Sequence, residues 1–347
     1  MEVSKKSDTF APNRTRRRFS SARNVAYQGG TFFVYTFMRY TKQLLSLQQQ
    51  IDVLKQRGLL IENEEEAKNA LDIISYFRLA GYWRLMEADR QQHIFKPGSR
   101  FSQILNLYRF DEELRILLFS AIQHIEVAVR TRMIRIFAER HGAFWFMDPT
   151  LAENNNLFAG NLRNLQEELS RSEDEFIQEH FQKYDTPSMP PVWKTMEVAS
   201  MGTLSKLYSN MDDSAAKKAV SRSFGIPKFE YMRSWLRCVT VVRNICAHHA
   251  RLWNATIVIN PSLPSRLPNT WITNRQLTPD KLYPHLCCIA YWLNAINPAN
   301  TFTQDIKALL SKYPVVDPAA MGFPKGWQSE PLWQYTNKTA CRYPFTL

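Results

Sequence analysis

Residues 110–141 read FDEELRILLFSAIQHIEVAVRTRMIRIFAERH, and this stretch decides the fold class. Apolar residues recur every three or four positions along one side of it, at Phe110, Leu114, Leu117, Ala121, Ile125 and Ala128. That spacing is typical of one face of an α-helix, and Gly142 follows as a stop signal. The stretch therefore predicts one long helix with an apolar side.

Helical spacing also dominates the rest of the chain. From residue 42 onward, apolar positions recur at Leu44, Leu47, Ile51 and Leu54, and Gly58 ends the pattern. Further helices are expected at 64–80, 157–170, 173–183, 192–200, 202–211, 213–224, 228–250, 279–296 and 303–312. Strand alternation is scarce, and only TIVIN at 256–260 resembles a short strand. The predicted fold class is all-α, a helical bundle.

Composition divides the 347 residues into four parts. We expect a basic extension at 1–37, an N-terminal helical subdomain at 38–100, a helical core at 101–313 and a tail at 314–347 that wraps the core. Three interpretations of 1–37 stay open: a targeting segment, a disordered basic tail that binds RNA, or upstream codons read in error. We favour a start at Met38, because the helical pattern begins just after it.

Charge and cysteine content limit the partners and the compartment. The formal net charge of +12 suggests an acidic partner, with nucleic acid first, although residues 1–39 carry half of that excess. No apolar run reaches the roughly 20 residues that a membrane span needs. The five cysteines form no CxxC pair and no secretory signal is evident, so we expect a soluble cytoplasmic protein with reduced thiols.

One short stretch carries an unusual mixture of polar groups. Residues 241–254 read VVRNICAHHARLWN, with Arg243 five residues before His248 and six before His249. Metal-free RNA cleavage needs a base for a ribose 2′-OH, a cation for the attacked phosphate and an acid for the leaving oxygen. Histidine can serve as base or acid near neutral pH, and arginine grips phosphate oxygens. The spacing alone is weak support, since Arg135 and His141 repeat it in the long helix.

Helix geometry restricts how this motif could work. At 100° per residue, Arg243 and His248 lie about 140° apart on a straight helix, whereas Asn244 and His248 share a face. The motif therefore requires a helix that begins or bends there, or a composite site made by two chains. Asn244 could then hold the His248 ring and fix its tautomer. The alternative is that both histidines are satisfied polar groups of a helical bundle.

VVRNICAHHARLWN resembles the signature of the Abi-like, or abortive infection, family of bacterial proteins, which belongs to the HEPN superfamily of α-helical ribonucleases. Other blocks resemble the same family in the same order: ISYFRLAGYW (74–83), LYRFDEELR (107–115), IEVAVRT (125–131), PPVWKTMEVASMGTLSKLY (190–208) and MGFPKGW (321–327). The resemblance covers roughly residues 43–335 and makes 101–313 a HEPN-like core. Residues 1–37 have no counterpart in it.

The resemblance implies a metal-independent endoribonuclease of phage defence, toxin-like, that assembles its site from two HEPN units without a cofactor or metal. This chain has one Arg-Asn-x3-His, so the resemblance implies a homodimer. It assigns the cut to Arg243 and His248 and an orienting role to Asn244, while His249 either assists or only packs. The alternative function is a non-catalytic protein that binds a small or guide RNA or a partner protein. A regulatory small RNA or an antitoxin could restrain the nuclease.

Several weaker features accompany the motif. Glu126 and Arg130 are four residues apart on the long helix, either as a surface pair or as a pair that orients Arg243 or His248. Arg251 is a candidate contact for RNA phosphate. We interpret Asp111–Arg115 as a structural pair at the start of the long helix. Other candidates are better explained by packing, namely Trp253 and, against a role in base stacking, Arg78, Tyr82 and Trp83.

Overall fold

The structure is a computed structural model that describes residues 25–28, 31–34, 41 and 43–334. It divides the chain into two compact units, residues 1–46 and 47–347. Within the first unit, β1 (Val25–Gln28) and β2 (Thr31–Val34) form an antiparallel pair in which Val25 lies opposite Val34. Within its described residues, the regular secondary structure of the second unit is helical except for one small hairpin, which confirms the predicted all-α class.

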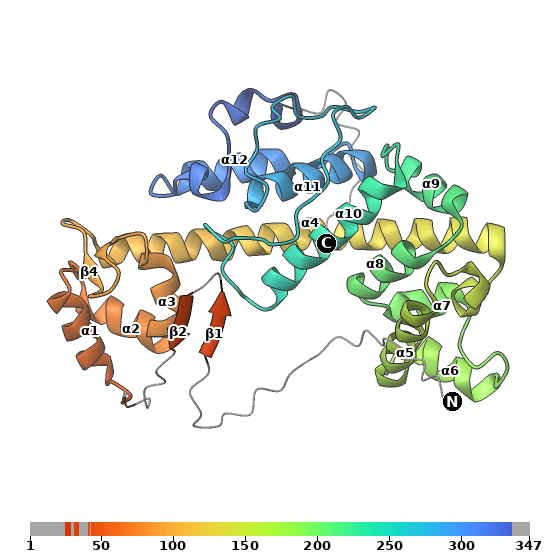
Figure 1. Cartoon of the computed structure of the whole chain (residues 1–347), viewed down its shortest axis with the longest axis horizontal. Coiled ribbons are helices and arrows are strands. Elements are labelled where there is room, and N and C mark those ends of the chain that lie inside the picture. The colour runs from red at the N-terminus through yellow and green to blue at the C-terminus, as the bar shows by residue number, and fades with distance from the viewer. Residues whose placement is uncertain (1–24, 29–30, 35–40, 42, 335–347) are drawn as a thin grey trace, which may run out of the picture. The chain divides into compact units, whose positions relative to one another are not determined.

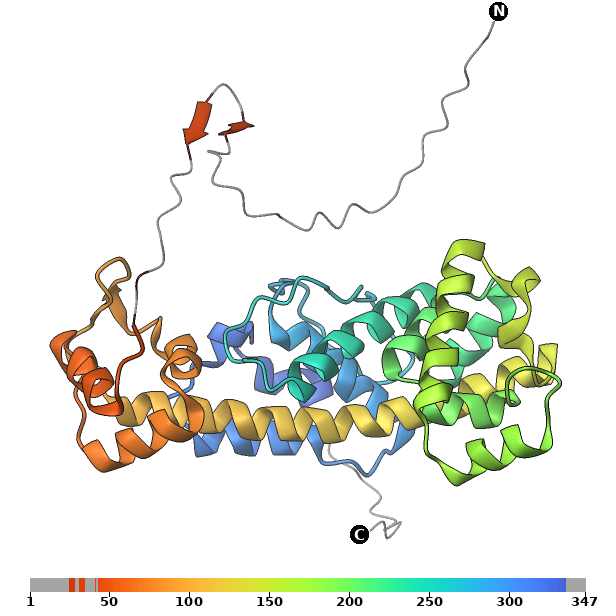
Figure 2. The same cartoon turned by 90° about the horizontal axis from the view of Figure 1, so that it is seen from below.

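Helix α4 (Phe101–His141) is the long helix that the sequence predicts, and helices from both ends and the middle of the second unit pack along its length (Figures 1 and 2). It begins nine residues before the predicted segment, since Arg100 precedes it and the Arg100 amide donates to the Gln103 side chain at 3.1 Å. It ends as predicted at Gly142, which has a φ of 83°. Most of the predicted apolar side is buried, as at Phe110, Leu114, Ala121 and Ile125.

The N-terminal end of α4 carries three short helices and a small hairpin (Figure 1). These are α1 (Leu47–Gln56), α2 (Glu64–Ile74), α3 (Tyr76–Trp83), β3 (Glu87–Asp89) and β4 (Ile94–Phe95). The single helix expected at 64–80 is wrong, because Ser75 has a φ of 76° and breaks it in two. The Ser75 hydroxyl accepts from the Arg78 amide and starts α3. Leu44, expected in the first helix, precedes α1 and is exposed.

Five helices lie at the C-terminal end of α4. They are α5 (Asn155–Arg171), α6 (Glu175–Lys183), α7 (Val192–Val198), α8 (Met201–Asn210) and α9 (Ser214–Ser223). Each agrees with a predicted helix to within two residues at either end. Two short 3-10 helices, Trp145–Met147 and Pro149–Leu151, precede them.

Three helices pack against the middle of α4: α10 (Phe229–Ala247), α11 (Leu282–Ile296) and α12 (Phe302–Lys312). TIVIN at 256–260 forms no strand, and Val258 in it is exposed. As far as Gln334 the tail forms 3-10 helices at Pro318–Met321, Trp327–Ser329 and Pro331–Gln334, the last of which contacts α11 and α12. Residues 335–347 of the predicted tail lie outside the described residues. In the part of the chain that the structure describes, no helix is long and apolar enough to cross a membrane.

Candidate functional site

Helix α10 ends inside the Arg-Asn-x3-His motif. Its buried side anchors the helix through Trp235, Val239, Val242 and Cys246, and the last helical residue is Ala247. His248 follows with φ −90° and ψ 9°, and its amide donates to the Asn244 carbonyl at 3.0 Å. The predicted helix 228–250 therefore extends three residues too far at this end. The helix thus ends between Arg243 and the histidines, whereas the sequence suggested a helix that begins or bends there, or a site made by two chains.

The motif's side chains differ in exposure. Arg243 is partly buried, and its guanidinium carbon lies 5.6 Å from the centre of the Phe119 ring on α4. Its Nε is buried and has no hydrogen-bond partner among the described residues. Asn244, His248 and His249 are exposed. The structure thus presents both imidazoles to solvent and does not enclose them in the bundle.

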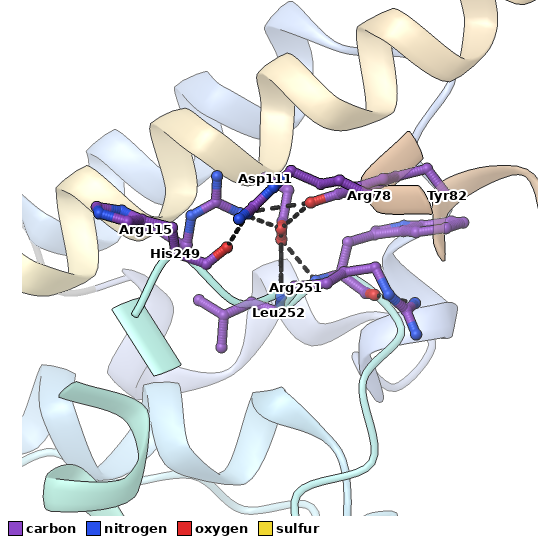
Figure 3. A network of polar contacts seen from close by, with 8 residues as sticks. Arg78, Tyr82, Asp111, Arg115, His249, Arg251 and Leu252 are labelled. Atoms are coloured by element: carbon purple, nitrogen blue, oxygen red, sulfur yellow. Dashed lines mark hydrogen bonds and ion pairs between the residues drawn. The ribbon is translucent and has the colours of Figure 1, made fainter. Parts of the chain in front are cut away.

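The loop after α10 is fixed by one buried carboxylate, Asp111 of α4 (Figure 3). Asp111 is completely buried, and its oxygens accept hydrogen bonds from the amides of Leu252 at 3.1 Å and Trp253 at 2.6 Å. The Tyr82 hydroxyl donates to it at 2.8 Å, and the Arg115 guanidinium at 2.5 Å. One side chain therefore joins α3, α4 and the loop. Burial raises the pKa of the Asp111 carboxyl, whereas Arg115 and the other donors act in the opposite direction.

Two arginines stabilise the same loop, Arg78 from α3 and Arg251 from within the loop. The Arg78 guanidinium of α3 donates to the His249 carbonyl at 2.6 Å, and that of Arg251 donates to the Trp253 carbonyl at 2.7 Å. His249 has a φ of 54°. A positive φ outside glycine costs about 1–3 kcal/mol. A hydrogen bond from a charged group contributes about 1.5–3 kcal/mol, so Arg78 and the Asp111 contacts can hold this conformation.

These contacts revise two interpretations of the sequence and agree with a third. Asp111 and Arg115 do pair, but they are buried and lie about three and four turns into α4, not at its start. Tyr82 and Trp83 are core residues, as packing predicts, and Trp253 is buried beside Tyr82 with the ring centres 6.4 Å apart. Arg78 is exposed and holds the loop, a role that its position in the sequence did not indicate. One feature of the sequence could have indicated the buried anchor: Asp111 places a carboxylate on the same side of the helix as the apolar Leu114 and Leu118.

Glu126 and Arg130 form the expected pair at 3.0 Å, and both side chains are mostly buried. Arg130 also donates to the Ala199 carbonyl at 3.0 Å, between α7 and α8, and lies 3.9 Å from Glu197. Across the described ranges, no hydrogen bond or ion pair joins Glu126 or Arg130 to Arg243 or His248. Their observed contacts instead connect α4 to the end of α7 and the junction with α8.

A cleft of about 770 Å³ lies beside the motif, between α2, α3, α4 and the end of α10. Cys246, Ala247 and His249 line it on the α10 side. Its α4 side includes Ile116 and Phe119, which are exposed apolar side chains. Burial raises the pKa of the Cys246 thiol to about 12, so Cys246 is a protonated neighbour of the motif at neutral pH. Over the described residues, no three His, Cys, Asp or Glu side chains gather to hold a metal ion.

Comparison with known proteins identifies the family. The sequence profile of the family described as "Abi-like protein" matches residues 69–254. The chain belongs to the Abi-like family. The matched region runs from α2 to the loop after α10, so in this Abi-like protein it contains Arg78, Asp111, Arg115 and the motif itself. No curated protein and no solved structure matches the chain.

Proposed function

We propose that this abortive-infection-type protein is a metal-independent endoribonuclease of the HEPN kind that cuts RNA by attack of a ribose 2′-OH. One observation carries the proposal: α10 ends between Arg243 and His248, and a loop anchored on the buried Asp111 presents the imidazoles to solvent. This arrangement supplies the two groups that the reaction needs, a fixed cation in Arg243 and a solvent-accessible acid or base in the histidines.

Each group has a defined role in the proposed reaction. One imidazole, from His248, takes the proton of the 2′-OH as that oxygen attacks the adjacent phosphorus. The guanidinium of Arg243 stabilises the negative charge on the phosphoryl oxygens. The bond from phosphorus to the 5′-oxygen breaks, and the leaving oxygen receives a proton from a second imidazole. The products are a 2′,3′-cyclic phosphate and a 5′-OH end.

The second imidazole comes, in this proposal, from another copy of the chain. Arg-Asn-x3-His occurs once in the sequence. Exposed apolar residues surround the cleft next to it, with 84% of Ile73 and 66% of Ile116 accessible to solvent. Exposed apolar surface of this kind marks interaction sites. A homodimer across this face would bring two motifs together.

The test compares Arg243→Ala and His248→Ala with the parent protein. Each protein is incubated with RNA in excess chelator, and the 3′ ends are analysed for cyclic phosphate. Loss of general acid–base catalysis lowers rates by about 10²–10⁴-fold, and we expect each variant to lose at least 100-fold in cleavage rate. Expression of the parent, but not of the variants, should arrest growth.

Matched controls use residues of the same type away from the motif. Arg135 and His124 are exposed on α4. Arg135→Ala and His124→Ala therefore remove one guanidinium and one imidazole at positions outside the motif. We expect both controls to cut like the parent. If the Arg243 and His248 variants also cut at the parental rate, the proposed function is wrong. RNA that is bound strongly at low salt but never cut would instead favour a non-catalytic RNA-binding protein.

A further inference from the structure

A second open groove, of about 1000 Å³, lies between α5, α8 and the first half of α10. Four cationic side chains line it: Arg163 of α5, Lys206 of α8, and Arg233 and Arg237 of α10. We refer to these four residues and the space between them as the cationic groove. Asparagine amides line the same space, at Asn154, Asn156, Asn161, Asn164 and Asn210.

The charge of the cationic groove is mostly uncompensated. Arg163, Lys206 and Arg237 are exposed, and none has a hydrogen bond or ion pair within the described part of the chain. Arg233 lies 3.8 Å from Glu153, but Glu153 also binds the buried ammonium of Lys217. The remaining carboxylate, Glu167, is 3.6 Å from Arg171. Three free cations around one groove attract a polyanion and are not needed to hold the fold.

The cationic groove is aligned with the motif along α10. At 100° per residue, Arg233, Arg237 and Asn244 lie within about 40° of one another on that helix, and Thr240 lies on the same side. Arg233 and Asn244 are separated by about 16 Å of helix rise. This row of polar side chains on one side of α10 therefore leads from the cationic groove to the exposed end of the helix, where His248 lies.

We propose that the cationic groove binds the sugar–phosphate backbone of the RNA strand and directs it to the 243–249 segment. The proposal rests on the proposed function and names where its substrate lies. Guanidinium and ammonium groups bind phosphate oxygens, and amides can pair with phosphates or 2′-hydroxyls. The lining is polar, with Leu157 as its one large apolar side chain, so it favours a backbone over the apolar anchors of a protein partner.

The experiment measures RNA binding separately from cleavage. Full-length protein carrying His248→Ala binds a fluorescent single-stranded 20-mer of uridine, with and without Arg163→Gln, Lys206→Gln and Arg237→Gln together. We expect the triple substitution to weaken binding at least tenfold near 0.1 M salt. Each lost phosphate contact should reduce the slope of log affinity against log salt by about 0.7, so the slope should fall by about 2.

The control removes the same formal charge elsewhere. Arg84, Arg90 and Lys325 are exposed and have no hydrogen bond or ion pair in the described residues, so Arg84→Gln, Arg90→Gln and Lys325→Gln together form a matched triple. We expect this control to bind RNA within twofold of the His248→Ala parent. Equal effects of the two triples would overturn the proposal. Polyglutamate that displaces RNA at equal charge would also overturn it, because the groove would then be a general site for acidic chains.

Cleavage assays keep the two proposals distinguishable. If the protein with an intact motif cuts RNA at the same rate with and without the groove triple, the groove proposal fails and the nuclease proposal stands. If no protein cuts RNA but the groove triple still abolishes binding, the nuclease proposal fails and the groove remains an RNA-binding surface. Circular dichroism confirms that each triple variant is folded.

Discussion

Asp111 anchors the loop that follows the motif. Its two oxygens face only donors, namely Tyr82, Arg115 and the amides of Leu252 and Trp253. In Asp111→Asn an NH2 group must face one of these donors, and Arg115 loses its buried counter-charge. Removing one partner of a buried ion pair costs about 3–5 kcal/mol, so we expect a loss of that size in the free energy of unfolding, measured in urea.

Amide hydrogen exchange separates this local role from a general loss of stability. The Leu252 and Trp253 amides should exchange faster in Asp111→Asn than the rest of the core, because their acceptor is weakened. Glu139→Gln is the control, since the Arg135–Glu139 pair is exposed and such pairs contribute about 0–1 kcal/mol. Uniform acceleration of exchange throughout the protein would contradict a specific anchoring role for Asp111.

At the residue scale, the sequence alone identifies the candidate site residues that are close together in the chain. Arg243, Asn244, His248 and His249 lie within seven positions, so their types and spacing can be recognised directly. The anchor could not be found in this way, because Asp111 lies 141 residues before Leu252. Burial of a carboxylate among apolar side chains is visible in a helical pattern, but its partners follow only from the packing of three elements.

At the element scale, α4 and α9 are joined by the carboxylate of Asp213. Asp213 caps α9 by accepting from the Ala215 and Ala216 amides at 2.9 Å, and it binds Arg140 and His141 at the end of α4 at 2.9 Å. Burial alone would raise the pKa of Asp213, but these hydrogen bonds outweigh it and lower the pKa to about 2. The ion pairs thus favour the charged carboxylate in the folded state.

This pKa predicts a pH dependence of stability with a definite sign. Because the folded pKa is below the ordinary value of 3.8, the stabilisation is complete above about pH 4 and is lost as the pH falls toward 2. It amounts to about 2 kcal/mol at pH 7. The free energies of unfolding of parent and Asp213→Ala should converge below pH 4. Asp72→Asn, at an exposed position of α2, serves as control; a constant gap between parent and Asp213→Ala down to pH 3 would contradict the assignment.

Most elements could be predicted because their apolar residues repeat with a helical period. The predicted boundaries are wrong where a backbone conformation, or a contact outside the periodic pattern, decides where an element begins or ends. Ser75 splits the expected helix 64–80 through a positive φ, and the Gln103 cap allows α4 to begin at Phe101. TIVIN at 256–260 alternates like a strand but has no neighbouring strand among the described residues, and an isolated strand has no partner for its backbone groups.

At the scale of the whole molecule, the proposed site is complete only in a pair of chains. Three exposed apolar residues lie on α2, α3 and α4 next to the motif: Ile73, Phe77 and Ile116. Their side chains are largely exposed and contribute little to the core, so Phe77→Asp with Ile116→Asp should leave each chain folded. A buried aspartate at an interface is strongly unfavourable, and we expect the pair of substitutions to produce monomers in analytical ultracentrifugation. RNA cleavage should fall with the dimer fraction and recover partly at high protein concentration.

The control is Val258→Asp, at another exposed apolar position, which should leave both the mass and the cleavage rate unchanged. A monomeric double variant that still cuts RNA at the parental rate would show that one chain holds the whole site, and the imidazole that protonates the leaving oxygen would then have to be His249 of the same chain.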